Sequence, residues 1–216
     1  MSYTGTGANA TVGHGLGVAP KTIWIKNRPD ADSWVVYHDT LGPTKGLTLD
    51  TGVAATTAST FFNDTAPTSS VFSIGSGGRT NGSSDAMMAY CFAEIDGFSK
   101  FGEYTGNAST DGPFVYLGFK PSWLMIKVTN AANDWTIWDA SRDPYNVTGR
   151  ILRADSNNAE FDGRGGSRDI DFLSNGFKIR SSNTTMNTNS YNYAYFAFAE
   201  CPFKTANGRG ITTSGA

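Results

Sequence analysis

The sequence predicts an all-β protein, a tandem-duplicated β-sandwich with two pseudo-equivalent halves of about 100 residues packed together. Three observations support this: the composition, an internal repeat, and short apolar runs separated by turn residues. The 216 residues include 25 glycines and are rich in Thr, Ser and Asn, which favour turns and strands. Glu, Leu and Lys are scarce, and these good helix formers would dominate a helical bundle.

The second observation is that the chain repeats itself. Tyr3-Thr4-Gly5 recurs as Tyr104-Thr105-Gly106, and the same offset, without a gap, places Trp34 on Trp135. Four residues are then inserted in the second copy, near 144–146, after which the register resumes. Further matched groups are Leu16-Gly17 with Leu117-Gly118, Pro20 with Pro121, Ile25-Lys26 with Ile126-Lys127, and Phe92-Ala93-Glu94 with Phe198-Ala199-Glu200.

The repeat sets the expected domain boundaries. We expect one β-sandwich repeat at 1–103, a second at 104–210, and a flexible tail at 211–216. No Gly- or Ser-rich linker separates the copies, because the junction 98–103 is aromatic. We therefore expect the halves to pack about an approximate twofold axis, with two independent domains as the alternative.

The third observation is the series of short apolar or alternating runs, each bounded by turn residues. Pro20 precedes the first clear strand of copy one, a position that proline tolerates. The most apolar run, 86–94, is predicted to be a central strand. The expected strands of copy one are 21–26, 34–37, 47–49, 70–74 and 86–94, and those of copy two are 114–117, 123–128, 135–138, 151–152, 176–180 and 191–200.

Charge and hydropathy exclude several classes of protein. Net charge is −2 and Lys and Arg never form a run, which argues against nucleic-acid binding. No apolar stretch is long enough for a transmembrane helix. The N-terminus lacks the basic and apolar regions of a secretory signal, so we expect synthesis in the cytoplasm without secretion.

Residues that bind metals or cofactors form no recognisable pattern. Cys91 and Cys201 are expected to be buried free thiols, with a disulfide as the alternative, which no framework spacing supports. His14 and His38 have no metal-ligand spacing. We predict no cofactor and no zinc site. Whether the Asp-containing loops at 30–32 and 162–171 bind calcium stays open, because neither follows a known calcium-loop pattern.

Two matched Lys and Glu pairs are the clearest charged candidates. Lys26 and Lys127 end one apolar strand in each half, and Glu94 and Glu200 end another. The favoured interpretation is one structural ion pair in each half, Lys26 with Glu94 and Lys127 with Glu200. The alternative is a pair of catalytic carboxylates, but a duplicated acid would occupy two identical environments, whereas acid–base catalysis needs two different ones.

Tryptophans are the candidate contact residues. Trp34 and Trp135 are matched and are expected to anchor the cores. Trp24, Trp123 and Trp138 have no Trp counterpart, and an exposed strand face carrying them would offer a platform for a glycan or a partner protein. That interpretation requires at least two of the three to be exposed and coplanar.

Several motifs give the chain a family resemblance. The stretch His14–Ile23 resembles a tail-fibre pattern in which a His, a Leu-Gly pair and a Pro lead into a β-sandwich strand. The wider set resembles an uncharacterised β-rich domain of tailed-phage structural proteins. Its motifs here are Tyr90-Cys91-Phe92-Ala93-Glu94, Gly97-Phe98-Ser99-Lys100-Phe101-Gly102, Tyr104-Thr105-Gly106-Asn107 and Gly112-Pro113-Phe114-Val115-Tyr116.

The resemblance covers the chain to about Lys204 and implies a virion component. The implied function is non-enzymatic: a tail fibre, adhesin or capsid decoration that acts by protein–protein assembly and surface recognition. It implies a location in the virion, other virion proteins as partners, and a homo-oligomer. The alternative function is a glycan-binding module for attachment to a host-surface glycan.

Overall fold

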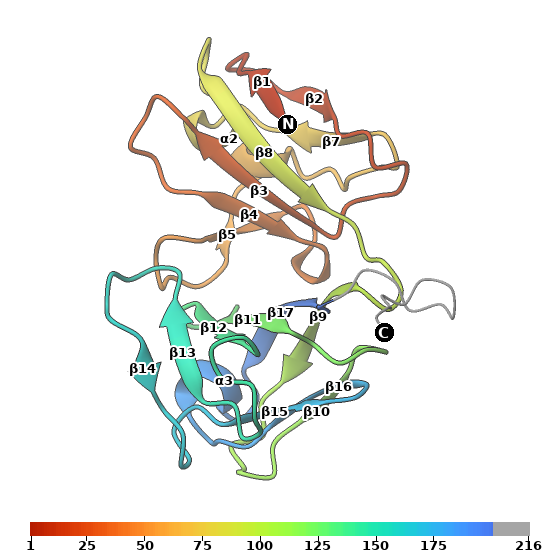
Figure 1. The fold of residues 1–216 in the computed structure, drawn as a ribbon. Helices are drawn as coiled ribbons and strands as arrows, with labels where there is room; N and C mark the ends of the chain where they lie inside the picture. Colours follow the sequence, from red (N-terminus) through yellow and green to blue (C-terminus); the bar gives the residue numbers. More distant parts are fainter. Residues whose placement is uncertain (201–216) are drawn as a thin grey trace. The chain divides into compact units, whose positions relative to one another are not determined.

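The structure, a computed structural model, describes residues 1–200 (Figure 1). It divides the chain into a first unit, Met1–Ala93 with the short segment Thr129–Asn133, and a second unit, Glu94–Val128 with the chain from Asp134 onward. The expected division after residue 103 is therefore wrong. Strand β9 (Ser99–Thr105) pairs along its whole length with β17 (Asn192–Phe198), so its first residues belong to the second unit. The predicted tail at 211–216 and Cys201 lie outside the described residues.

The first unit is built on a six-stranded antiparallel sheet in which β8 lies between β1 and β3 (Figure 1). Burial alternates along β3, as in a strand with one face toward a core. In β3, Ile23 and Ile25 are fully buried, while Trp24 and Lys26 on the opposite face are half-buried. In spatial order the strands are β1 (Ser2–Thr4), β8 (Ala86–Phe92), β3 (Thr22–Asn27), β4 (Val35–His38), β5 (Lys45–Thr48) and β6 (Thr56–Thr57).

The second unit repeats this sheet strand for strand. The register is also repeated: Trp24 lies opposite Tyr90 in the first unit, and Met125 lies opposite Phe196 in the second. In the equivalent spatial order, the strands after β9 and β17 are β11 (Trp123–Val128), β12 (Thr136–Asp139), β13 (Arg150–Arg153) and β14 (Phe161–Asp162). The predictions of an all-β fold and of two similar halves are confirmed.

A smaller sheet covers one face of each large sheet. In the first unit it consists of β2 (Ala10–Gly13) and β7 (Val71–Ile74), and in the second of β10 (Phe114–Tyr116), β16 (Gly176–Ile179) and β15 (Ile170–Leu173). Val12 pairs with Phe72, whereas Val115 pairs with Phe177, so the ungapped offset shifts by two residues in this segment. The short helices are η1 (Asp39–Leu41), α1 (Ser59–Phe62), α2 (Gly78–Asn81) and α3 (Thr184–Asn187).

Each core lies between a large and a small sheet. In the first unit, buried Ile23 and Ile25 of the large sheet share one cluster with Phe72 and Ile74 of β7 and with Phe62 of α1. In the second unit, Phe177 of β16 packs edge-on against Tyr104 of β9 and Tyr195 of β17, at centroid distances of 6.0 and 5.6 Å. Two faced sheets of this kind form a sandwich.

Candidate functional sites

A buried asparagine links two distant segments of the first unit. Asn81, in α2, is fully buried, and its amide nitrogen donates to the carbonyl oxygens of Ala8 (2.6 Å) and Gly75 (2.9 Å). Its side-chain oxygen accepts the backbone N–H of Thr6 at 2.6 Å, while the Tyr3 hydroxyl donates to the carbonyl of Thr80. We call this arrangement the asparagine latch. It ties the segment after the first strand to a helical turn late in the same unit.

The second unit contains the same latch. Asn187, in α3, donates to the carbonyls of Ser109 (2.7 Å) and Ser181 (2.9 Å) and accepts the N–H of Asn107 at 2.8 Å. The Tyr104 hydroxyl again donates to the carbonyl just before the asparagine, that of Met186, at 2.7 Å. The repeated Tyr-Thr-Gly motif therefore has a structural role in both units, because its tyrosine bonds to the helical turn that carries the latch asparagine.

The glycine of that motif is required by a close backbone approach. A Cβ at Gly5 would collide with the carbonyl oxygen of Gly82, and a Cβ at Gly106 would collide with that of Thr188. Sequence reasoning found the Tyr-Thr-Gly repeat but missed the asparagines. The signal was present, because Asn81 and Asn187 are separated by the same offset as Phe92 and Phe198.

The predicted ion pairs of Lys26 with Glu94 and of Lys127 with Glu200 are wrong. In the antiparallel register Lys26 lies opposite Met88, whereas Glu94 follows the far end of β8 beyond Phe92. Four residues of strand, at about 3.3 Å each, already separate these positions by about 13 Å. The second unit repeats the geometry, with Lys127 opposite Ala194 and Glu200 beyond Phe198. Both residues end strands, but at opposite ends of an antiparallel pair.

These four residues have other surroundings. The Lys26 ammonium donates to the carbonyl oxygens of Asp30 (2.9 Å) and Asp32, so it fixes the loop before β4. Glu94 lies 3.8 Å from Lys100, and Glu200 is exposed. Lys127 is fully buried, and burial lowers the pKa of its ammonium to about 8, against the opposing influence of nearby Asp155 and Asp134.

The tryptophans divide into buried and half-buried groups. Trp138 is fully buried, and its indole N–H donates to the carbonyl of Arg168 at 2.9 Å, so its predicted contact with a glycan is wrong. Trp24 and Trp123 are half-buried and pack against Phe92 and Phe198, respectively. They belong to different units. Among the expected anchors, Trp135 is fully buried while Trp34 is half-buried and stacks on Tyr90.

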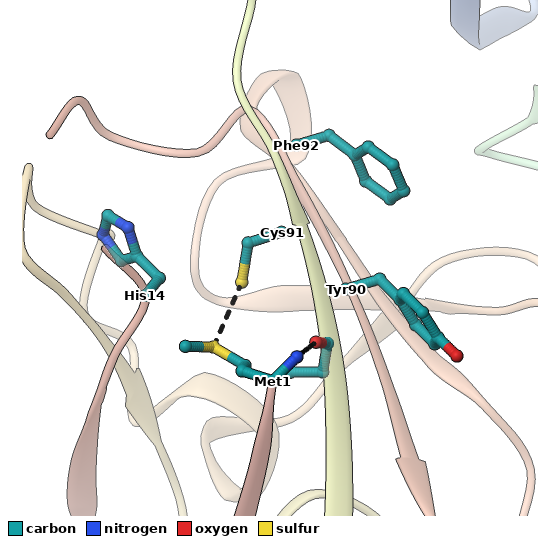
Figure 2. A pocket seen from close by; sticks show the side chains of 6 residues that line it. Met1, His14, Tyr90, Cys91 and Phe92 are labelled. Carbon is teal, nitrogen blue, oxygen red and sulfur yellow. Dashed lines mark hydrogen bonds between the residues drawn. The ribbon is translucent and has the colours of Figure 1, made fainter. Parts of the chain in front are cut away.

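A cavity of about 230 Å³ in the first unit is lined by two sulfur atoms (Figure 2). The Cys91 thiol donates to the Met1 thioether across 3.8 Å, and the Met1 ammonium donates to the carbonyl of Ala89. Burial raises the pKa of the Cys91 thiol to about 11, which makes it a poor nucleophile at neutral pH. Both ring nitrogens of His14 are engaged, with the carbonyl of Thr68 and the N–H of Leu16.

The Asp-containing loops are held by hydrogen bonds and ion pairs. The carbonyls of Asp30 and Asp32 bind Lys26, as described above, and Asp171 accepts from Arg180 at 2.6 Å. Hydrogen bonds from Arg164 lower the pKa of Asp162 to about 2. Within residues 1–200, no group of three or more His, Cys, Asp and Glu residues is arranged to hold a metal ion.

The second unit carries an ion-pair network that the first lacks at the corresponding place. Within residues 134–162, Arg142 pairs with Asp139 and Glu160, Arg150 with Asp162, and Arg153 with Asp134. The Asp143 carboxylate is buried and accepts the N–H groups of Gly149 and Arg150. Sequence reasoning did not find this network because its partners are widely spaced along the chain.

Strand β10 presents aromatic side chains to solvent. It is an edge strand of the three-stranded sheet, and Val115 points into the core. Phe114 and Tyr116, on the opposite face, are 46% and 61% exposed. We call the face formed by Phe114 and Tyr116 the β10 surface. Lys100 lies 5.8 Å from the Tyr116 ring centroid, and Lys178, opposite Phe114 in the register, pairs with Asp111 at 2.8 Å.

These features define an all-β protein of two sheet units that share one topology, one register and one latch. No helix in the described part of the chain is long and apolar enough to cross a membrane. The family model described as a domain of unknown function (DUF7483) matches residues 1–202, and the chain belongs to this family. No curated protein and no solved structure matches the chain.

Proposed function

We propose that the protein is a non-enzymatic structural component of a tailed-phage particle, either a tail fibre or adhesin or a capsid decoration. It works by assembly with other virion proteins and with further copies of itself, after synthesis in the host cytoplasm. The tailed-phage context rests on the resemblance of its sequence motifs. The mode of action rests on the β10 surface.

The β10 surface has the features of a protein interface. Two large aromatic side chains are exposed side by side on an edge strand, where a neighbouring chain finds both apolar area and unpaired backbone groups. Lys100 and Lys178, each beside a carboxylate, provide charged groups near the aromatic pair. An apolar, aromatic centre with a polar rim is the usual anatomy of a protein–protein interface.

Light scattering on the purified protein at micromolar concentration tests this proposal. The expected result is an oligomer that a Phe114→Ser/Tyr116→Ser double variant converts to smaller species. Tyr145→Ser is the matched control, because Tyr145 is 81% exposed in a loop outside the β10 surface. A second measurement compares how much wild-type protein and how much double variant is incorporated into assembled phage particles. The proposal fails if the wild-type protein is monomeric in solution and the particles incorporate the double variant as efficiently as the wild-type protein.

The alternative function, a glycan-binding module for host attachment, no longer draws on Trp138. A different observation favours it: the exposed ring of Phe161 beside two guanidinium groups in the second unit. An exposed ring offers apolar contact to a sugar, and a guanidinium offers paired N–H donors to a carboxylate.

A further inference from the structure

Arg168 differs from the other arginines of the second unit. Each of the other five within the described residues has at least one carboxylate within 4.0 Å. Arg168 has no carboxylate within that distance among residues 1–200. The five arginines that do have a carboxylate within 4.0 Å are Arg142, Arg150, Arg153, Arg164 and Arg180.

The guanidinium of Arg168 retains donors for a ligand. Its Nη1 donates to the carbonyl of Ser167 at 2.8 Å, and its buried Nε has no hydrogen-bond partner. A guanidinium has five N–H donors, so the two terminal nitrogens keep N–H groups that no acceptor in the described chain engages. Burial and the neighbouring Arg153 charge lower the pKa of Arg168, against the opposing influence of Asp134, so its cation is disfavoured by desolvation as well as by a like charge.

The position of Arg168 is fixed by its backbone and by its aliphatic stem. Its N–H donates to the carbonyl of Gly163, and its own carbonyl accepts the Trp138 indole N–H. A Cβ at Gly163 would overlap the Arg168 stem and the Phe161 ring, so glycine leaves the space in which this side chain packs. A donor held in place before binding loses less conformational entropy when a ligand arrives.

An aromatic ring completes the arrangement. Phe161, on edge strand β14, is 41% exposed, and the guanidinium carbons of Arg168 and Arg153 lie 5.8 and 5.9 Å from its centroid. Arg153 is already paired with Asp134 at 2.6 Å. The site therefore offers one guanidinium that no carboxylate of the described residues contacts, next to one exposed ring.

We infer that Arg168 and Phe161, with Arg153 beside them, bind an acidic glycan, with the carboxylate of a uronic acid on the terminal nitrogens of Arg168. A planar carboxylate fits two N–H groups of a guanidinium, and the sugar contacts the exposed part of the Phe161 ring. One guanidinium without a carboxylate partner can bind a single uronate carboxylate of such a glycan. A nucleic acid carries a phosphate on every nucleotide and is bound through several cationic contacts. This inference gives the glycan-binding alternative a ligand class and does not depend on assembly through the β10 surface.

Calorimetric titration with a hyaluronan oligosaccharide, which carries a glucuronate in each repeat, tests the site. The matched ligand is the same oligosaccharide with its carboxyl groups reduced to alcohols. Binding is expected for the first ligand and at least about 10-fold weaker binding for the second, because a charge-assisted hydrogen bond is lost. Arg168→Gln should weaken binding similarly, and Phe161→Ala should weaken it as well.

Arg180→Gln is the control variant, because Arg180 is paired with Asp171 and lies outside the site. It should bind like the wild-type protein. Thermal unfolding of each variant separates loss of the site from loss of the fold, and light scattering separates it from loss of assembly. The inference is overturned if hyaluronan and a galacturonate oligosaccharide both fail to bind, or if folded Arg168→Gln binds unchanged. It is also overturned if a glutamate-rich peptide binds more tightly than either sugar, since that would assign the site to a protein partner.

Discussion

The large sheets of the two units have the same topology, but the units differ in how they fill the space beside the centre of the sheet. Tyr37 and Trp138 occupy the same register position, opposite Ile23 and Leu124, respectively. The Tyr37 ring packs edge-on against buried Phe62, at a centroid distance of 5.4 Å. Trp138 instead donates a hydrogen bond to the backbone of Arg168. The first unit thus fills this place with an apolar helix, and the second with a polar loop.

The comparison shows which parts of a duplicated fold remain constant and which diverge. Strand order, register and the asparagine latch are the same in both units, because a shift of one residue would turn every buried side chain of a strand outward. The connection between the edge strand and the small sheet has no such constraint. It has diverged into α1 in one unit and, in the other, into a loop at 163–169 that carries Arg164 and Arg168.

The largest expected effect concerns this difference. Phe62→Ala should lower the free energy of unfolding by about 3–5 kcal/mol, because it leaves a cavity in a packed core. Arg168→Ala, at the corresponding place of the second unit, should cost only about 1 kcal/mol, since that side chain is half-exposed and unpaired. Urea denaturation measures both. Equal losses of unfolding free energy in the two variants would show that the two connections contribute equally to stability.

The latches should respond alike, with a smaller effect. Asn81→Ala and Asn187→Ala should each cost about 2–3 kcal/mol, because each leaves buried backbone groups without partners. Asn189→Ala, at an exposed position next to the second latch, serves as the control and should change stability by less than about 0.5 kcal/mol. A difference of several kcal/mol between the two latch variants in urea unfolding would contradict their structural equivalence.

The smallest effect distinguishes the matched lysines. Burial lowers the pKa of Lys127 to about 8, below its ordinary value, so the unfolded chain holds more protons above pH 8. The free energy of unfolding should therefore rise with pH, by about 1 kcal/mol from pH 7 to pH 9. This rise should be absent in Lys127→Met. Unfolding curves at several pH values measure it, and identical slopes for the two proteins would rule out the effect.

Much of the fold could be predicted from the sequence, because the strands have local signals. The run 123–128 is predicted without error, and the expected strand 21–26 differs from β3 by one residue at each end. Strand β9 was missed because its seven residues lie at the junction between the copies, and β15 because it belongs to the divergent connection. Both strands are defined by their pairing with other strands, β9 with β17 and β15 with β16, and local sequence does not show that pairing.

The charged and aromatic sites were less predictable. Lys26 and Glu94 looked like partners because both end strands, but only the antiparallel register shows that those ends are opposite. Trp138 looked like a contact residue because it breaks the repeat, whereas it replaces Tyr37 within the core. Arg168 has no sequence signal as a binding residue. What distinguishes it is that no carboxylate of the described residues lies within 4.0 Å, whereas the other five described arginines of the unit each have one.

The pairing of Ser99 with Phe198 has a topological consequence. The first and last strands of the large sheet in the second unit are therefore neighbours, and the start of one lies directly opposite the end of the other. A sheet of this kind can be opened at another connection and rejoined where its first and last strands meet, with little rearrangement of its strand order. The same geometry allows a unit to be copied in tandem, since a new copy adds to the chain without cutting through an existing sheet.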